Sequence, residues 1–115
     1  MSQIIRATIT ITIPKTAHQI LLKLHKSLQL DISSIVEGWL WKEYLEDNFE
    51  SLLDYYPSII LFFQDLSKKQ DHRFKLYLHL PPSDLPLPLN KLLPLVILKN
   101  TYPYLSLYQK KKEVK

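Results

Sequence analysis

The sequence contains no cysteine and only one glycine in its 115 residues. Without cysteine the chain can form neither a disulfide nor a thiolate metal site, and we expect a cytoplasmic protein. It also has no glycine-rich phosphate loop, no nucleophile elbow and no paired acids in a catalytic context. These absences favour a protein that is not an enzyme and needs no cofactor.

Long apolar runs are missing as well. No run approaches the roughly 18 residues of a membrane span, and the N-terminus has no signal-peptide pattern. With 46% hydrophobic residues the chain is nevertheless too apolar for a disordered tail. We therefore expect a soluble protein with no membrane partner. The composition, rich in Ile, Leu, Lys and Tyr, suggests a small archaeal virus or plasmid as its source, and thus the host cytoplasm.

Charge is unevenly distributed along the chain, although the net charge of +4 is modest. Four acids and no bases lie between Leu45 and Tyr56. Cations gather downstream, at Lys68, Lys69, Arg73, Lys110, Lys111, Lys112 and Lys115. A net charge of this size does not by itself indicate a nucleic-acid partner.

The clearest element is a strand that begins at Arg6 and ends at Pro14. Strand side chains alternate between two faces, so one face carries only isoleucine and the other only threonine. The face residues are Ile9, Ile11 and Ile13, and Thr8, Thr10 and Thr12. Because no comparable strand lies within hairpin reach, we expect this one to pair with a second copy of the chain.

Two helices follow. Apolar residues from Ala17 to Leu28 have helical spacing and predict a helix over 16–28, with Thr16 as its cap. A second helix is predicted to start within Asp31-Ile32-Ser33-Ser34, which offers three cap-capable side chains, and to continue to Pro57. Gly38 lies within it, where glycine costs about 1 kcal/mol relative to alanine, so we expect a close helix crossing there.

The C-terminal half is less patterned. Residues 58–66 are apolar enough for a short helix, and Phe74 to Leu80 alternate as a strand. The prolines between 81 and 88 predict an extended connector. Residues 92–98 fit a helical turn or a buried strand. A mobile, lysine-rich tail is expected at the end.

The order strand, helix, short turn, helix resembles the ribbon-helix-helix family of DNA-binding proteins over about residues 6–45. The resemblance is carried by the Thr/Ile alternation, Pro14-Lys15, Leu21, Leu24, Leu30, Ser33, Ile35, Val36, Trp39 and Leu40. It implies an intertwined homodimer whose two strands form one ribbon that enters the major groove. The turn would require Gln29 to adopt a left-handed or otherwise unusual conformation.

The resemblance also assigns roles to particular residues. It implies base readout by Thr8, Thr10 and Thr12, with Arg6 a candidate for guanine or phosphate. Phosphate contacts are implied for the start of the second helix and two lysines, namely Ile32, Ser33, Ser34, Lys15 and Lys26. The implied dimer core consists of Ile9, Ile11, Ile13, Leu21, Leu24, Ile35, Val36, Trp39 and Leu40.

Simpler interpretations stand beside these roles. The threonines also suit a solvated strand face, and Ser33 and Ser34 also suit plain helix capping. Trp39 and Trp41 suit packing, with Trp41 directed at the C-terminal half. The pairs His18/His25 and His72/His79 are each seven apart, and neither pair forms a metal site alone.

We therefore predict an α+β, mainly helical fold. Residues 1–56 would form a ribbon-helix-helix dimerisation and DNA-binding domain, and residues 57–115 an extension of uncertain fold. The predicted function is a sequence-specific transcriptional regulator, such as a repressor, that binds double-stranded DNA as a homodimer. The alternative is a protein-interaction factor, such as an antitoxin or a viral inhibitor of a host protein, that uses the dimer as a scaffold and binds its partner through residues 57–115.

Overall fold

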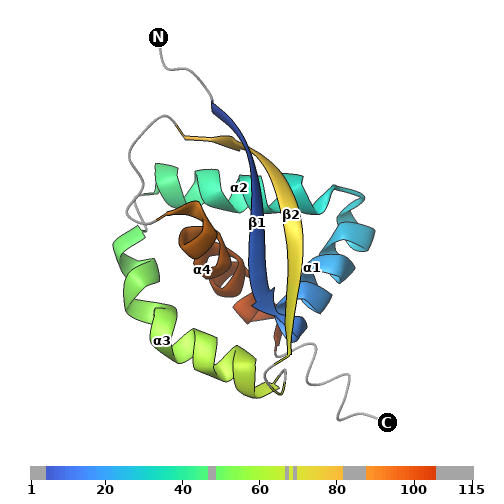
Figure 1. Cartoon of the computed structure of the whole chain (residues 1–115), viewed down its shortest axis with the longest axis vertical. Coiled ribbons are helices and arrows are strands. Elements are labelled where there is room, and N and C mark those ends of the chain that lie inside the picture. Colours follow the sequence, from blue (N-terminus) through green and yellow to red (C-terminus); the bar gives the residue numbers. More distant parts are fainter. Residues whose placement is uncertain (1–4, 47–48, 67, 69, 82–87, 106–115) are drawn as a thin grey trace.

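Two ten-residue strands lie side by side in front of a layer of helices (Figure 1). The computed structural model describes residues 5–46, 49–66, 68, 70–81 and 88–105. The elements follow in the order β1 (Ile5–Pro14), α1 (Lys15–Leu28), α2 (Ile32–Leu45), α3 (Phe49–Leu66), β2 (Asp71–Leu80), α4 (Leu89–Thr101) and a 3₁₀ turn, η1 (Tyr102–Tyr104). The fold is thus α+β and mainly helical, with one two-stranded antiparallel sheet.

The partner of β1 is β2 of the same chain. The strands pair antiparallel along their whole length, from Ile5 opposite Leu80 to Pro14 opposite Asp71. The expectation that β1 pairs with a second copy, as in an intertwined dimer, is therefore wrong. The predicted strand at Phe74–Leu80 is confirmed and is three residues longer at its start, and it supplies the hydrogen-bonding groups that β1 needs.

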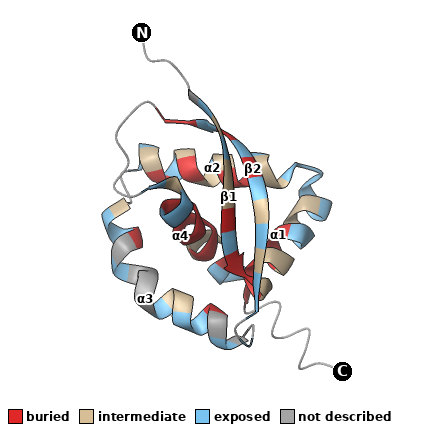
Figure 2. Ribbon diagram, viewed as in Figure 1, coloured by how far each residue is buried: buried red, intermediate tan, exposed pale blue. Residues whose placement is uncertain are grey.

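The two faces of the β1–β2 ribbon differ as the alternation predicts. Ile11 and Ile13 on β1, and Leu76 and Leu78 on β2, are at most 2% exposed. Figure 2 shows the buried and exposed residues alternating along both strands. The apolar face rests on the helices, so the threonine face points outward.

The turn between α1 and α2 adopts the left-handed backbone expected from the sequence. Gln29 has φ 56° and ψ 38°, and its N–H donates to the His25 carbonyl. Few residues other than glycine adopt this conformation readily, although polar side chains tolerate it. The predicted bounds of α1 agree with the structure to one residue, and α2 starts at Ile32 as expected.

The long second helix predicted to reach Pro57 is divided in two. Helix α2 ends at Leu45, and α3 begins at Phe49 and continues through Pro57 to Leu66. Proline usually ends a helix because it lacks an N–H and its ring crowds the preceding turn. Here it lies within a helix, so the prediction that the helix ends there is wrong.

Helix α4 is the centre of the fold. Every residue from Leu92 to Leu98 is buried, which is typical of a helix enclosed on all sides. Its internal proline, Pro94, removes only the bond to the carbonyl of Asn90, in the exposed first turn, where water can take its place. Of the two alternatives that the sequence left open for residues 92–98, the structure shows the helix.

The core draws on both halves of the chain, and the boundary expected at 56/57 falls within α3. The residues assigned to a dimer core all belong to this single-chain core. Ile11, Ile13, Leu21, Ile35, Val36 and Leu40 are buried, and Ile9, Leu24 and Trp39 are partly buried against it. The proline connector at 82–87 and the lysine tail at 110–115 lie outside the described residues.

A partly buried ion pair ties α2 to α4. The Glu43 side chain is 2% exposed, and one of its carboxylate oxygens accepts from Lys99 Nζ at 2.7 Å. Removing Lys99 would leave the Glu43 carboxylate buried without its counter-charge. The pair therefore favours this one arrangement of the two helices.

The close helix crossing expected at Gly38 is absent. Gly38 is exposed, and a Cβ built there would meet nothing within 4 Å in the described structure. Packing therefore does not require glycine at this position.

Truncating the inner face should destabilise the whole chain. Ile11 is 2% exposed, so Ile11→Ala should lower the free energy of unfolding by about 2–5 kcal/mol. The neighbouring Thr12→Ala on the exposed face should lower it by less than about 1 kcal/mol. Urea unfolding followed by circular dichroism measures both. Equal effects would contradict the assignment of the two faces.

Candidate nucleic-acid interface

The outward face of the ribbon combines hydroxyl groups from β1 with cationic and aromatic side chains from β2. Antiparallel register places these residues opposite one another in four cross-strand pairs. The pairs are Arg6–His79, Thr8–Tyr77, Thr10–Lys75 and Thr12–Arg73. All are exposed except Thr10, which is partly exposed, so none of the described helices covers this face.

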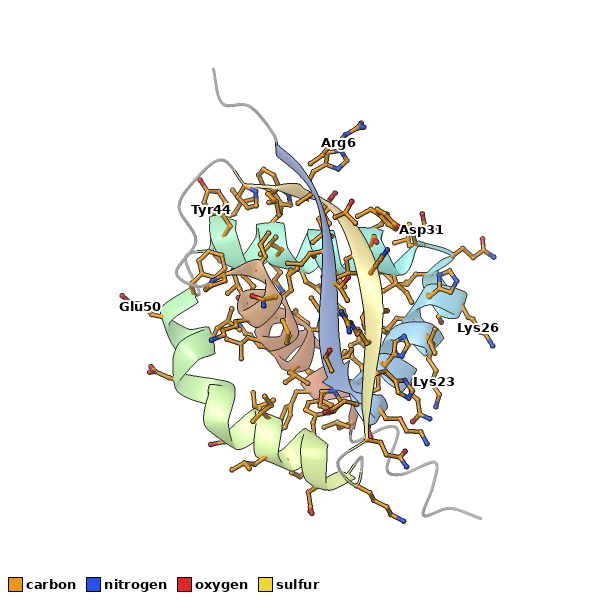
Figure 3. The ribbon with its side chains drawn as sticks, viewed as in Figure 1. Arg6, Lys23, Lys26, Asp31, Tyr44 and Glu50 are labelled. Atoms are coloured by element: carbon orange, nitrogen blue, oxygen red, sulfur yellow. The ribbon has the colours of Figure 1, made fainter. Side chains whose placement is uncertain are left out.

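The outward face of the ribbon carries positive charge, whereas α3 carries exposed acids. Arg6, Arg73 and Lys75 project from the outward face, and Asp71 is the acid at one end of β2. The exposed acids Glu50 and Asp54 lie on α3, which Figure 3 shows at the side of the molecule, away from the front of the ribbon. The ribbon therefore presents a local excess of cations that the modest net charge conceals.

Helix α2 holds the outer edge of β2 through three side chains spaced four residues apart. The Tyr77 N–H donates to Ser33 Oγ at 3.0 Å, and Trp41 Nε1 donates to the His79 carbonyl at 2.8 Å. Between them Glu37 Oε1 accepts the His79 N–H. Residues four apart share one helix face, so this stripe satisfies an otherwise open strand edge. The expectation that Trp41 packs on the C-terminal half is confirmed.

The hydrogen bond from the Tyr77 N–H to Ser33 Oγ holds the start of α2 beside the ribbon. The N–H groups of Ile32, Ser33 and Ser34 have no acceptor within the helix, which makes a helix start attractive to anions. The first intrahelical bond runs from the Ile35 N–H to the Asp31 carbonyl at 3.1 Å. Asp31 is exposed there, makes no side-chain cap bond and reduces the attraction for an anion.

The predicted site residues are only partly brought together. Arg6 and the three threonines share the ribbon face, and Ser33 contacts the ribbon edge. Lys15 lies at the far end of the ribbon, where its N–H donates to the Gln70 carbonyl at 2.9 Å. Lys26 is exposed near the end of α1 and points away from the ribbon in Figure 3.

The β2 contribution was not anticipated from the sequence. Arg73, Lys75, Tyr77 and His79 occupy the face opposite the apolar alternation of β2. That alternation was visible, but nothing in the sequence placed this strand next to β1. Once the pairing is known, the outward position of these four residues follows from the two-residue strand period.

Two histidines that are distant in sequence meet at the lower end of the ribbon. His18 Nδ1 and His72 Nδ1 are 2.8 Å apart, and the His18 ring stacks on Phe74 with centroids 4.7 Å apart. Burial, and secondarily His72, lower the pKa of His18 below its ordinary value. Among the described residues, no group of three or more His, Cys, Asp or Glu side chains is placed to hold a metal ion.

An apolar hollow of about 640 Å³ lies between α3 and the end of α4. Its lining residues are Ser58, Ile59, Phe62, Lys99 and Tyr102. Phe62 and Tyr102 are 41% and 46% exposed, and nearby Leu61 is 65% exposed. The described residues that line this surface all lie within residues 57–115.

Comparison of the chain with protein-family models, curated proteins and solved structures gives no match. None of the helices in the described ranges has the length and apolar character needed to cross a bilayer.

The histidine pair should make stability depend on pH. The folded state resists protonation of His18, whereas the unfolded chain accepts a proton near pH 6.5. Stability should therefore be highest above pH 6.5 and should fall as the pH drops below it. Urea midpoints measured at pH 7.5 and at about pH 5 would show the fall.

The control for this pH dependence is a second histidine of α1. His18→Gln should make the decline smaller, while His25→Gln, which is away from the pair, should leave it in place. A decline of the same size in all three proteins would show that the pair is not its source.

Proposed function

We propose that this protein binds double-stranded DNA by inserting the β1–β2 ribbon into the major groove, and that it regulates transcription, as a repressor does, by occupying that DNA. The major groove of B-DNA is wide enough for a two-stranded ribbon. In this proposal a single chain supplies both strands. Arg6 and the three threonines contact bases together with residues of β2.

The observation that carries the proposal is the uncovered outward face. A two-stranded sheet usually buries one face and solvates the other, so exposure alone does not indicate a ligand. Here, however, threonine hydroxyls stand directly opposite Lys75 and Arg73. Hydroxyl and cationic groups on one narrow, projecting surface are the groups that contact base edges and phosphates in DNA complexes.

The arrangement of the helices supports the resemblance to ribbon-helix-helix proteins in a modified form. Helix α2 packs on β2, α4 packs on β1, and α2 and α4 pack on each other. A ribbon-helix-helix dimer would supply the second strand and its supporting helix from another chain. We propose that β2 and α4 take these places here.

Phosphate contacts are proposed for the groups that flank the ribbon. The start of α2, with the N–H groups of Ile32, Ser33 and Ser34, is held at the β2 edge by Ser33. A phosphate beside the groove could bind there. Lys15 and Lys26 lie at or beyond the borders of the ribbon. Their charges would attract the DNA without fixing its position on the ribbon.

Replacing two of the threonines tests the readout directly. Sequences selected from random duplex DNA should bind the Thr10→Ala, Thr12→Ala double variant about tenfold or more weakly than the wild type, because a base-pair preference is typically worth about 1–3 kcal/mol. The fold should be retained because these side chains are not in the core. Fluorescence anisotropy measures the affinity, and circular dichroism checks the fold.

The salt dependence of DNA binding tests whether Lys75 contacts a phosphate, with Lys91 as the matched control. Lys75→Ala should reduce the slope of log K against log salt by about 0.9 if Lys75 contacts a phosphate, whereas Lys91→Ala, on α4, should not change it. Micromolar, sequence-indifferent binding by the wild type would contradict the proposal and would favour the second function described next.

The apolar hollow favours a second candidate, a protein-interaction factor. Exposed apolar patches of this kind often mark protein contacts. The hollow lies in the half of the chain for which the sequence suggested partner binding. The first partner to test is a second copy of the chain.

Sedimentation tests this second candidate. If the hollow joins two copies, the wild type should form a dimer and Phe62→Lys should be monomeric, because the new ammonium group would be desolvated in the contact. Ser51→Lys, an exposed position on the same helix with the same change in charge, should remain dimeric. A wild-type monomer at all concentrations would exclude self-association through this surface.

A further inference from the structure

One chain of hydrogen bonds crosses the upper end of the ribbon and ends on the arginine of its outward face. Arg6 Nε donates to His79 Nε2 at 3.2 Å. The other ring nitrogen, His79 Nδ1, lies 3.0 Å from Glu37 Oε1. Arg6 and His79 are also directly opposite each other in the strand register. A side chain of α2 is thus linked through one imidazole to the side chain that extends from the ribbon in Figure 3.

The bonding pattern fixes where the imidazole proton lies. A carboxylate only accepts, so Nδ1 must carry the hydrogen that Glu37 receives. Arg6 Nε only donates, so His79 Nε2 must offer a lone pair. A neutral ring protonated on Nδ1 satisfies both bonds, and the tautomer protonated on Nε2 satisfies neither.

The same pattern leaves the outer edge of the guanidinium open. Because only Nε is directed to His79, the end of the guanidinium formed by Nη1 and Nη2 is left for a ligand, and its donors lie in one plane as a fork. Such a fork matches the O6 and N7 acceptors of guanine, the most common specific arginine contact in the major groove.

His79 is itself held firmly by α2. Its backbone N–H donates to the same oxygen of Glu37 that faces its ring, and its carbonyl accepts from Trp41 Nε1 at 2.8 Å. The Glu37 side chain is 28% exposed. With backbone and ring both fixed to one helix, His79 offers Arg6 an acceptor at a defined position.

A shallow hollow of about 300 Å³ lies at this end of the ribbon. Its lining residues are Arg6, Ala7, Thr8, Tyr77, Leu78 and His79. Tyr77 is 65% exposed, so its ring is available for contact. A base edge presented to the ribbon would meet the arginine fork, a hydroxyl and an aromatic ring together.

We propose that His79, with its tautomer fixed by Glu37, is a positioning residue that orients Arg6 to read one guanine at this end of the bound DNA. The inference rests on the proposed DNA-binding function and adds which base is read and which residues hold the reader. It assigns Arg6 to a base rather than a phosphate because Arg6 projects from the threonine face, whereas the start of α2 lies at the ribbon border.

The first test needs no DNA. In the full-length wild-type protein, the ¹⁵N chemical shifts of His79 should show the hydrogen on Nδ1 at neutral pH. In Glu37→Leu that preference should be lost, with circular dichroism confirming that the variant folds. A wild-type ring protonated on Nε2 would overturn the positioning role, whatever the protein binds.

The second test uses selected DNA. Arg6→Ala should reduce the preference for G·C over A·T at one position by about 5- to 100-fold. His79→Phe keeps a ring but has no acceptor, and should reduce that preference at least threefold without changing the salt slope. His79→Gln, whose amide oxygen can accept from Arg6, should restore part of it.

Three outcomes would overturn the assignment. If Arg6→Ala weakened binding to all sequences alike and lowered the salt slope by about 1, Arg6 would be a phosphate contact. If His79→Phe retained the full guanine preference, His79 would not position Arg6. If the wild type selected no sequence, the proposed function would fail and guanine readout with it, while the nitrogen shifts would still decide the positioning role.

Discussion

The pairing of β1 with β2 is the constraint on which the rest of the structure depends. It joins two segments separated by three helices, so forming the ribbon closes a long loop, and packing of the helices must offset the entropy that this costs. Pairing hides the isoleucine face against α4 and directs the threonines outward. It also brings cations from the second half of the chain next to hydroxyls from the first, which neither half could do alone.

Local elements of the fold were predictable because their signals are local. The Thr/Ile alternation gave β1, the apolar stripe gave α1, and the cap-forming residues near Ser33 gave the start of α2. The partner of β1 was not predictable, since alternation shows which face of a strand is buried but not which strand lies beside it. The continuity of α3 through Pro57 was not predicted, and residues 92–98 were left open between helix and strand, because the local effect of proline is only one of the influences on a helix.

The candidate site, like the fold, was predictable from the sequence only in the parts that do not depend on strand pairing. Arg6 and the threonines lie on one exposed face, as their spacing requires. The contribution of β2 depends on the pairing and was invisible for that reason. The link from Glu37 to His79 was equally hidden, because it joins residues 42 positions apart whose side chains meet only when α2 lies along the ribbon edge. The four-residue spacing of Ser33, Glu37 and Trp41 indicates that they share one helix face, but it does not show what they contact.

The two strands of this ribbon are chemically different, one bearing hydroxyls and the other cations and a tyrosine. A ribbon made from two identical strands looks the same after half a turn, and so does the DNA that it prefers. This ribbon has no such symmetry. A duplex bound to it would be held in one orientation only, with the Arg6–His79 end and the Thr12–Arg73 end facing different sequences. The preferred site would then be a non-palindromic sequence with a direction along the genome.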